Sequence, residues 1–169
     1  MKKLYLIGGT MGIGKTTICQ VLKTKLDKSV FIDGDWCWDM HPFVVNKETK
    51  KLVLNNICAL LNNDIKCNAF ENIIFCWVMH EQSIIDDLLS RLDLNDVKVI
   101  AISLVCQKEA LKKRIQKDID QGIRKSDVLK RSIERMEMYQ KLDTYKIDVS
   151  YKTVEVVVDE IMKVGTKND

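Results

Sequence analysis

Short, wholly apolar runs recur along the chain and alternate with longer segments whose apolar residues lie three or four positions apart. The runs occupy residues 4–7, 30–32, 73–75 and 97–104, with a weaker run at 146–149. Such runs predict strands that are buried on both faces, whereas spacing near 3.6 residues predicts amphipathic helices. Because parallel strands need crossover connections, the alternation predicts a three-layer α/β/α fold with a five-stranded parallel sheet.

Helix boundaries are expected where capping residues flank the amphipathic segments. Gly122 is suited to end one helix, Ser126 to cap the next, and Thr153 to cap a last helix from about Val154. Residues 35–51 hold the only proline and show no clear period, so we expect a loop with a helical turn there. The other expected helices bury apolar residues over 18–26, 53–61, 84–92, 111–119 and 129–139.

The composition fits one soluble domain over residues 1–169. Hydrophobic residues make up 46% and charged residues 30%, and a single proline leaves no sign of a linker. The net charge of +3 is too small to indicate nucleic-acid binding, so no nucleic-acid partner is expected. We expect a monomer or a homodimer.

Cysteine spacing and the lack of long apolar stretches bear on the compartment. The six cysteines form no CxxC pair and no metal-finger spacing, which indicates free thiols. The first apolar run is too short for a signal peptide, and no apolar stretch reaches the roughly 18 residues of a membrane span. These features predict a cytoplasmic protein with no membrane partner.

Residues 9–16 match the pattern G-x-x-x-x-G-K-[ST] at every fixed position, between the first apolar run and a predicted helix. In such a loop the backbone N–H groups and the helix N-terminus hold phosphate groups, the lysine reaches the β- and γ-phosphates, and the threonine binds Mg²⁺. The pattern predicts binding of ATP and Mg²⁺, with Lys15 also catalytic and Thr16 a metal ligand. The expected nucleotide contacts are Gly9, Thr10, Met11, Gly12, Ile13, Gly14, Lys15, Thr16 and Thr17.

Asp33 and Asp35 follow the second apolar run directly, at the edge of a parallel sheet where ligands bind. One carboxylate can hold Mg²⁺ while the other accepts the proton of an attacking hydroxyl group. The alternative is an Asp-Gly-Asp turn whose side chains only cap backbone amides. Beside a phosphate loop, the functional interpretation is the stronger one.

Arginines gather between positions 114 and 135. Arg124 falls in the loop after Gly122, where a mobile cation can neutralise charge on a transferring phosphoryl group. The alternative for any such charge run is a solvated helix face. That interpretation is adopted for Lys112, Lys113, Lys130, Arg131 and Arg135.

Together, the loop at 9–17, the Asp-Gly-Asp sequence and the basic segment resemble the nucleoside-monophosphate-kinase-like family of small P-loop kinases. This family includes shikimate, gluconate and adenylylsulfate kinases and chloramphenicol phosphotransferase. The resemblance implies the P-loop NTPase fold with a short lid. It also implies that Asp33 supports the metal, that Asp35 faces the acceptor, and that Arg114 and Arg124 serve as lid-base and lid arginines.

Three tryptophans, Trp36, Trp38 and Trp77, fall just beyond the second and third predicted strands, where the acceptor is expected to bind. They are suited either to stack on a planar or apolar acceptor or to pack as partly buried core residues. His80 lies at the same rim, as a substrate ligand or as a structural histidine at a helix start.

The function predicted from these residues is transfer of the γ-phosphate of Mg·ATP to a hydroxyl group of a small-molecule acceptor. The alternatives are a nucleoside or nucleotide kinase, and a P-loop ATPase or regulatory module without an acceptor. The segment after the third strand lacks the Asp-Gly-x-Pro-Arg sequence of adenylate-type kinases, which makes a nucleoside monophosphate less suited as acceptor. Residues 46–49 end in threonine rather than the aspartate of Asn-Lys-x-Asp, so guanine specificity is unsupported.

Overall fold

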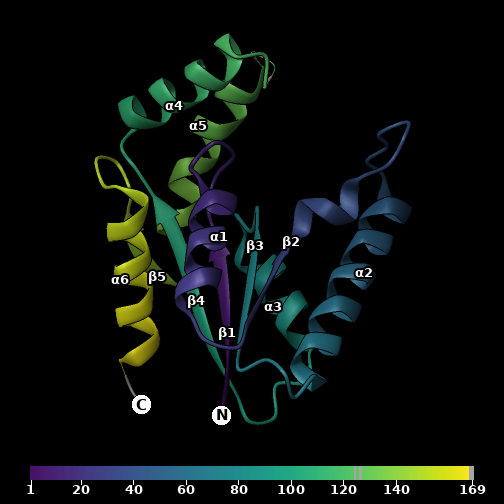
Figure 1. Ribbon diagram of the computed structural model, residues 1–169. Helices are drawn as coiled ribbons and strands as arrows, with labels where there is room; N and C mark the ends of the chain where they lie inside the picture. The colour runs from purple at the N-terminus through teal and green to yellow at the C-terminus, as the bar shows by residue number, and fades with distance from the viewer. Residues whose placement is uncertain (124, 126, 168–169) are drawn as a thin grey trace.

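A single five-stranded sheet, with every strand parallel to its neighbours, forms the centre of the computed structural model, which describes residues 1–123, 125 and 127–167 (Figure 1). The strand order is β2-β3-β1-β4-β5, which places the first strand in the middle. This arrangement confirms the predicted sheet, and each predicted run lies within or overlaps one strand. The strands are β1 (Lys2–Gly8), β2 (Ser29–Asp33), β3 (Asn72–Trp77), β4 (Val97–Val105) and β5 (Tyr145–Asp148).

Helices cover both faces of the sheet. One face packs against α1 and α6, and the other against α2, α3 and part of α5 (Figure 1). α4 packs against α5 and against the loop that follows β1. The helices are α1 (Lys15–Lys25), a 3₁₀-helix η1 (Gly34–Trp38), α2 (Lys47–Lys66), α3 (Gln82–Ser90), α4 (Lys108–Asp120), α5 (Asp127–Gln140) and α6 (Val154–Thr166).

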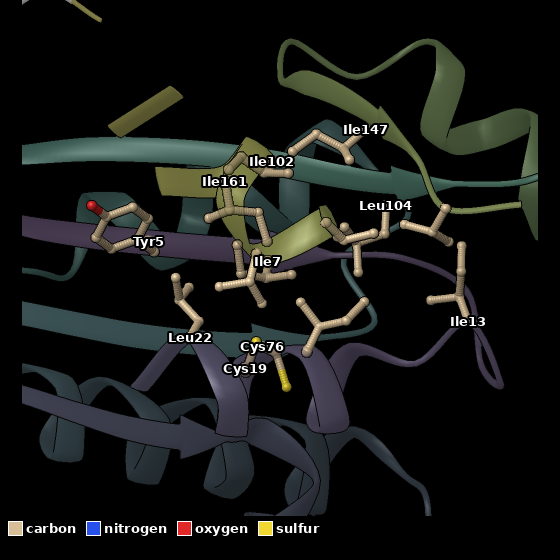
Figure 2. Packing of buried hydrophobic residues seen from close by; sticks show 14 of the residues in the cluster. Tyr5, Ile7, Ile13, Cys19, Leu22, Cys76, Ile102, Leu104, Ile147 and Ile161 are labelled. Atoms are coloured by element: carbon tan, nitrogen blue, oxygen red, sulfur yellow. The ribbon is translucent and has the colours of Figure 1, made fainter. Parts of the chain in front are cut away.

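The central strand supplies side chains to both hydrophobic layers because successive residues of a strand point to opposite faces. Tyr5 and Ile7 join the layer under α1 and α6, where Leu22 and Ile161 meet them (Figure 2). Leu4 and Leu6 join the other layer. Burial on both faces explains why β1 is apolar without alternation from Leu4 to Ile7.

The start of α2 differs from the sequence prediction. The helix begins at Lys47, inside the segment expected to be a loop, because a capping box stabilises its first turn. The Asn46 side chain accepts a hydrogen bond from Thr49 N–H at 2.9 Å, and Thr49 Oγ1 accepts one from Asn46 N–H at 2.9 Å. The usual glutamate or glutamine partner is replaced by threonine, so the signal was missed.

The other predicted caps can be compared where the chain is described. Gly122 follows α4 with a φ of 71°, and Thr153 caps α6 by accepting a hydrogen bond from Val156 N–H. Both predictions are confirmed, whereas Ser126 lies outside the described residues. In the described part of the chain, no helix has the length and apolar character needed to cross a membrane.

Removing the cap should destabilise the fold measurably. Asn46→Ala is expected to lower the free energy of unfolding by ~1 kcal/mol, because it leaves a first-turn N–H group without its partner. Urea denaturation measures the change. Lys50→Ala, an exposed substitution on the same helix, is the control and should alter stability by less than about 0.5 kcal/mol. Equal stabilities of Asn46→Ala and the control would rule out the capping role.

Candidate phosphate-binding site

The glycine-rich loop joins β1 to the N-terminus of α1. Gly14 precedes the helix in a left-handed conformation, with a φ of 104°, and contributes no side-chain cap. The N–H groups of the first helical turn are therefore left for a ligand, and the helix dipole favours a negatively charged one. This geometry is that of an anion-binding site.

Lys15 lies folded against this loop. Its residue is 9% exposed, and its ammonium group donates hydrogen bonds to the carbonyl oxygens of Gly9, at 2.9 Å, and Thr10, at 3.2 Å. The cation is thus held at the loop by backbone oxygens. Phosphate oxygens can take over these hydrogen bonds at little cost, because they are stronger acceptors.

The two predicted metal-site residues meet directly. Thr16 Oγ1 donates a 2.7 Å hydrogen bond to Asp33 Oδ2, and Asp33 Oδ1 accepts one from Asp35 N–H at 3.0 Å. Asp33 is buried, at 5% exposure, next to the phosphate loop. A hydroxyl and a carboxylate oxygen at this distance suit Mg²⁺, which is commonly bound by one or two protein oxygens together with phosphates and water.

A cavity of about 400 Å³ opens over the loop. Asp35 reaches it from η1, and four residues of α4 or its C-terminal end line the opposite wall. Sequence analysis identified Arg114 among these four and missed the rest, although their spacing of three and four residues places them on one helix face. The lining residues are Met11, Gly12, Gly14, Lys15, Thr16, Thr17, Asp35, Arg114, Lys117, Asp118 and Gln121.

A second cavity, of about 240 Å³, adjoins the first through the shared residues Gly14, Thr17 and Arg114. Arg114 forms part of its wall and is fixed by hydrogen bonds to the carbonyl oxygens of Ile13 and Val149. The rest of the wall comes from the phosphate loop, from α1, and from the β5–α6 connection and the start of α6, the last two of which no sequence pattern indicated. It consists of Ile13, Ile18, Val149, Lys152, Thr153, Val154 and Val157.

The three tryptophans lie around η1 and the end of β3. Trp36 is 55% exposed with its ring edge on Phe31, while Trp38 and Trp77 are half-buried. A Cβ atom at Gly34 would lie 2.6 Å from Trp77 Cγ, so only glycine fits between Asp33 and Asp35. None of the three indoles is among the described lining of either cavity.

α5 contacts the phosphate loop directly. Thr10 Oγ1 donates a 2.8 Å hydrogen bond to the Ser132 carbonyl oxygen, and the Tyr139 ring packs on Gly8. Arg135, on the same helix, is half-buried. The expectation that Arg135 belongs to a solvated face is therefore wrong, whereas Lys112, Lys113, Lys130 and Arg131 are exposed as predicted.

His80 lies at the end of the β3–α3 connection with 18% of its side chain exposed. Burial, and secondarily the charge of Arg135, lower the pKa of His80 below its ordinary value of 6.5. The imidazole is therefore neutral at neutral pH. Of the residues predicted as catalytic, Arg124 lies outside the described residues, so its role stays a prediction.

No group of three or more His, Cys, Asp or Glu side chains in the described ranges is arranged to hold a metal ion. A site made by Thr16 and Asp33 has only two protein oxygens, so phosphate oxygens would have to complete it. All six cysteines are free thiols, as predicted.

This fold and this loop define a protein with the P-loop NTPase fold. More particularly, a family model described as an AAA domain matches residues 6–140, and the chain belongs to that family. No curated protein matches the chain at a significant level.

Solved structures share the fold over nearly the whole chain. A gluconokinase from Sinorhizobium meliloti 1021 has a TM-score of 0.70 at 16% identity, covering 96% of this chain and 90% of its own. The tunicamycin resistance protein of Deinococcus radiodurans has a TM-score of 0.72 at 16% identity, with coverages of 98% and 96%. Shikimate kinase from Acinetobacter baumannii, in complex with shikimate, has a TM-score of 0.65 at 18% identity, with coverages of 100% and 96%. The predicted resemblance to the nucleoside-monophosphate-kinase-like family is confirmed.

The lowered pKa of His80 predicts a pH dependence of stability. Above about pH 6.5 the imidazole is neutral in both the folded and unfolded states. Below it, the unfolded chain binds a proton that the folded protein resists, so stability falls as the pH decreases toward the folded-state pKa. His80→Asn should reduce the slope of stability between pH 7.5 and 5.5, by at most about 1.4 kcal/mol per pH unit. Chemical denaturation at each pH measures it, and identical slopes in the two proteins would contradict it.

Proposed function

We propose that this protein is an ATP-dependent small-molecule kinase that transfers the γ-phosphate of Mg·ATP to a hydroxyl group of a small acceptor. The observation that carries the proposal is the 400 Å³ cavity, where the phosphate loop, with Thr16 bonded to Asp33, faces the carboxylate of Asp35. A loop for phosphates, a metal site and a second carboxylate are the parts that phosphoryl transfer requires of a protein. We expect the reaction to take place in the cytoplasm.

The nucleotide would occupy both cavities. The phosphates fit the large cavity, where the loop N–H groups and Lys15 supply donors and positive charge. The base fits the smaller cavity, where the guanidinium plane of Arg114 and the apolar side chains of Val154 and Val157 offer flat, partly apolar surface. Arg114, one of the predicted nucleotide ligands, would contact the nucleotide from the wall that the two cavities share.

Thr16 and Asp33 would hold Mg²⁺ with their oxygens, since their side chains already lie within a hydrogen bond of each other. The bound ion would neutralise charge that develops on the phosphates. Asp33 is buried and accepts two hydrogen bonds, so it is suited to a fixed role. Asp35 is exposed at the cavity wall, where an acceptor can approach it.

Asp35 would act as the general base. It accepts the proton of the acceptor hydroxyl as that oxygen forms a bond to the γ-phosphorus, and the bond to ADP breaks. Lys15 would stabilise the negative charge on the phosphates, and Arg124 would add a second positive charge. Trp36, Trp38, Trp77 and His80 are proposed to surround the acceptor beyond Asp35.

The direct test is a panel of acceptors: nucleosides, nucleoside monophosphates, sugar acids, shikimate-like acids and antibiotics. Acceptor-dependent release of ADP supports a kinase, and the responding class decides between a small-molecule kinase and a nucleoside or nucleotide kinase. Hydrolysis of ATP at the same rate with and without every compound would instead support a P-loop ATPase.

Lys15→Ala should weaken Mg·ATP binding or turnover by tenfold or more, because the ammonium group provides charge-assisted hydrogen bonds to phosphate. Calorimetric titration with ATP and steady-state assays measure the effect. Lys23→Ala, a half-buried lysine on the same helix but outside both cavities, is the control. Wild-type ATP affinity and turnover in Lys15→Ala would show that the loop does not bind phosphates.

Asp35→Asn should lower phosphoryl transfer by ~10² or more while Mg·ATP affinity changes little, since only the basic oxygen is lost. Asp33→Asn is the matched comparison. It should lower Mg²⁺ affinity or activity by about 10- to 100-fold, and raised Mg²⁺ should restore part of the lost activity. Both are assayed with the acceptor that the panel identifies. Full transfer activity in Asp35→Asn at saturating Mg²⁺ would remove Asp35 as the base.

A further inference from the structure

A third cavity, of about 140 Å³, lies between α5, the end of β4 and the phosphate loop. It shares Ile13 with the smaller nucleotide cavity and no described residue with the larger one. Neither the nucleotide nor the acceptor of the proposed reaction occupies it. The cavity is therefore a separate place where a ligand can bind.

The inner wall of this third cavity is apolar. Ile13, Leu104 and Tyr139 line it and are each at most 2% exposed, and Met136 adds a half-buried thioether. Apolar cavities of roughly 150 Å³ accept a benzene-sized molecule. A methionine side chain adapts its shape to such a ring, and its sulfur contacts aromatic ring edges favourably. The interior of the third cavity therefore suits a single aromatic ring.

The mouth of the third cavity carries a negative charge. Glu137 and Gln140 are the exposed side chains of α5 in its lining. Glu137 is the only charged residue in the described lining, and no ion pair joins it to another described residue. Glu134, by contrast, lies on the same helix outside this lining, 3.9 Å from Lys130. A carboxylate at the mouth attracts a cation and repels an anion, so the ligand that fits is a ring with a positive charge.

Ile13 connects the third cavity to the nucleotide site. Its side chain is folded under its own loop beside Leu104, because a Cβ atom at Gly9 would lie 2.9 Å from Ile13 Cγ2 and 3.3 Å from Leu104 Cβ (Figure 2). The Ile13 carbonyl oxygen accepts a 3.0 Å hydrogen bond from Arg114, which lines both nucleotide cavities. A ring in the third cavity contacts Ile13 and so favours the loop conformation that holds Arg114.

We propose that the third cavity binds a small aromatic amine, with its ring on Met136 and Leu104 and its ammonium group at Glu137, and that this ligand strengthens nucleotide binding. The binding site does not depend on the proposed kinase function, whereas the coupling rests on it because it acts through the nucleotide site. A ligand changes affinity elsewhere only if it binds one conformation better, and the contact with Ile13 supplies that preference. The nucleotide must then strengthen binding of the amine by the same factor.

Benzylamine is the probe for the site, and methionine methyl groups are the reporters. The whole protein is labelled with [¹³C-methyl]methionine, and the signals of Met136 and Met138 are assigned with Met136→Leu and Met138→Leu. Without nucleotide, benzylamine should shift the Met136 signal saturably. Met138, half-buried on the same helix but outside the described lining, is the internal control. Equal shifts of the two signals, or no saturable shift of Met136, would overturn the site.

Charge variants test why an amine binds. Glu137→Gln should weaken benzylamine by about threefold or more, the upper range for an exposed ion pair, and leave benzyl alcohol unaffected. Glu134→Gln, the matched control, should bind benzylamine like the wild type. Benzoate should bind the wild type more weakly than benzylamine does. Benzoate affinity equal to that of benzylamine, or unchanged benzylamine affinity in Glu137→Gln, would show that the site does not select an amine.

The coupling is measured by calorimetric titration of Mg²⁺ and β,γ-imido-ATP, with and without saturating benzylamine. The amine should tighten binding of the analogue by about fivefold, the lower range for coupled sites. Unchanged or weakened binding of the analogue would contradict the coupling. Failure of the analogue to bind at all would overturn the proposed function and the coupling together, while the Met136 shift, recorded without nucleotide, still decides whether the amine site exists.

Discussion

The hydrogen bond between Thr16 and Asp33 joins the two halves of the site, and the rest of the arrangement depends on it. Thr16 belongs to α1, directly after the phosphate loop, and Asp33 ends β2, which is separated from β1 in the sheet by β3. A 2.7 Å contact across that distance requires β2 and β3 to be in register and α1 to pack flat on the sheet. Those conditions are met by the apolar layer of Tyr5, Ile7 and Leu22. Hydrophobic packing thus sets the positions of Thr16 Oγ1 and Asp33 Oδ2.

Glycine at three points allows this close packing. A Cβ atom at Gly12 would lie 2.6 Å from Ile115 Cγ1, and one at Gly34 would lie 2.6 Å from Trp77 Cγ. The first contact brings α4 onto the phosphate loop, and the second brings β3 against η1. Gly14 instead provides the left-handed turn into α1. The loop glycines are recognisable from the phosphate-loop motif. The need for glycine at position 34, where Trp77 packs closely, is not recognisable from the Asp-Gly-Asp sequence.

The sequence predicted the sheet well because its strands are short apolar runs separated by amphipathic helices, and local pattern is enough to recognise both. It also predicted the phosphate loop from its motif and placed Asp33 at the carboxyl edge of the sheet, whereas the hydrogen bond between Thr16 and Asp33 came only from the structure. It could not predict the wall formed by Lys152 and Val154, since that wall arises from the position of β5 at the sheet edge. The partial burial of Arg135 could not be predicted, because the basic sequence of α5 does not show which face of the helix packs against the phosphate loop.

The phosphate loop is a point of contact for two helices that are far from it in sequence. α4 is fixed to it by the Gly12 contact with Ile115 and by the hydrogen bond from Arg114 to Ile13. α5 is fixed to it by the hydrogen bond from Thr10 to the Ser132 carbonyl. A loop displacement of a few tenths of an ångström cannot be absorbed in such contacts, because packed side chains and hydrogen bonds tolerate little change in distance. The phosphate loop therefore fixes the positions of both helices, and the charges of Arg114 and Arg135, one on each helix, are positioned by one backbone segment.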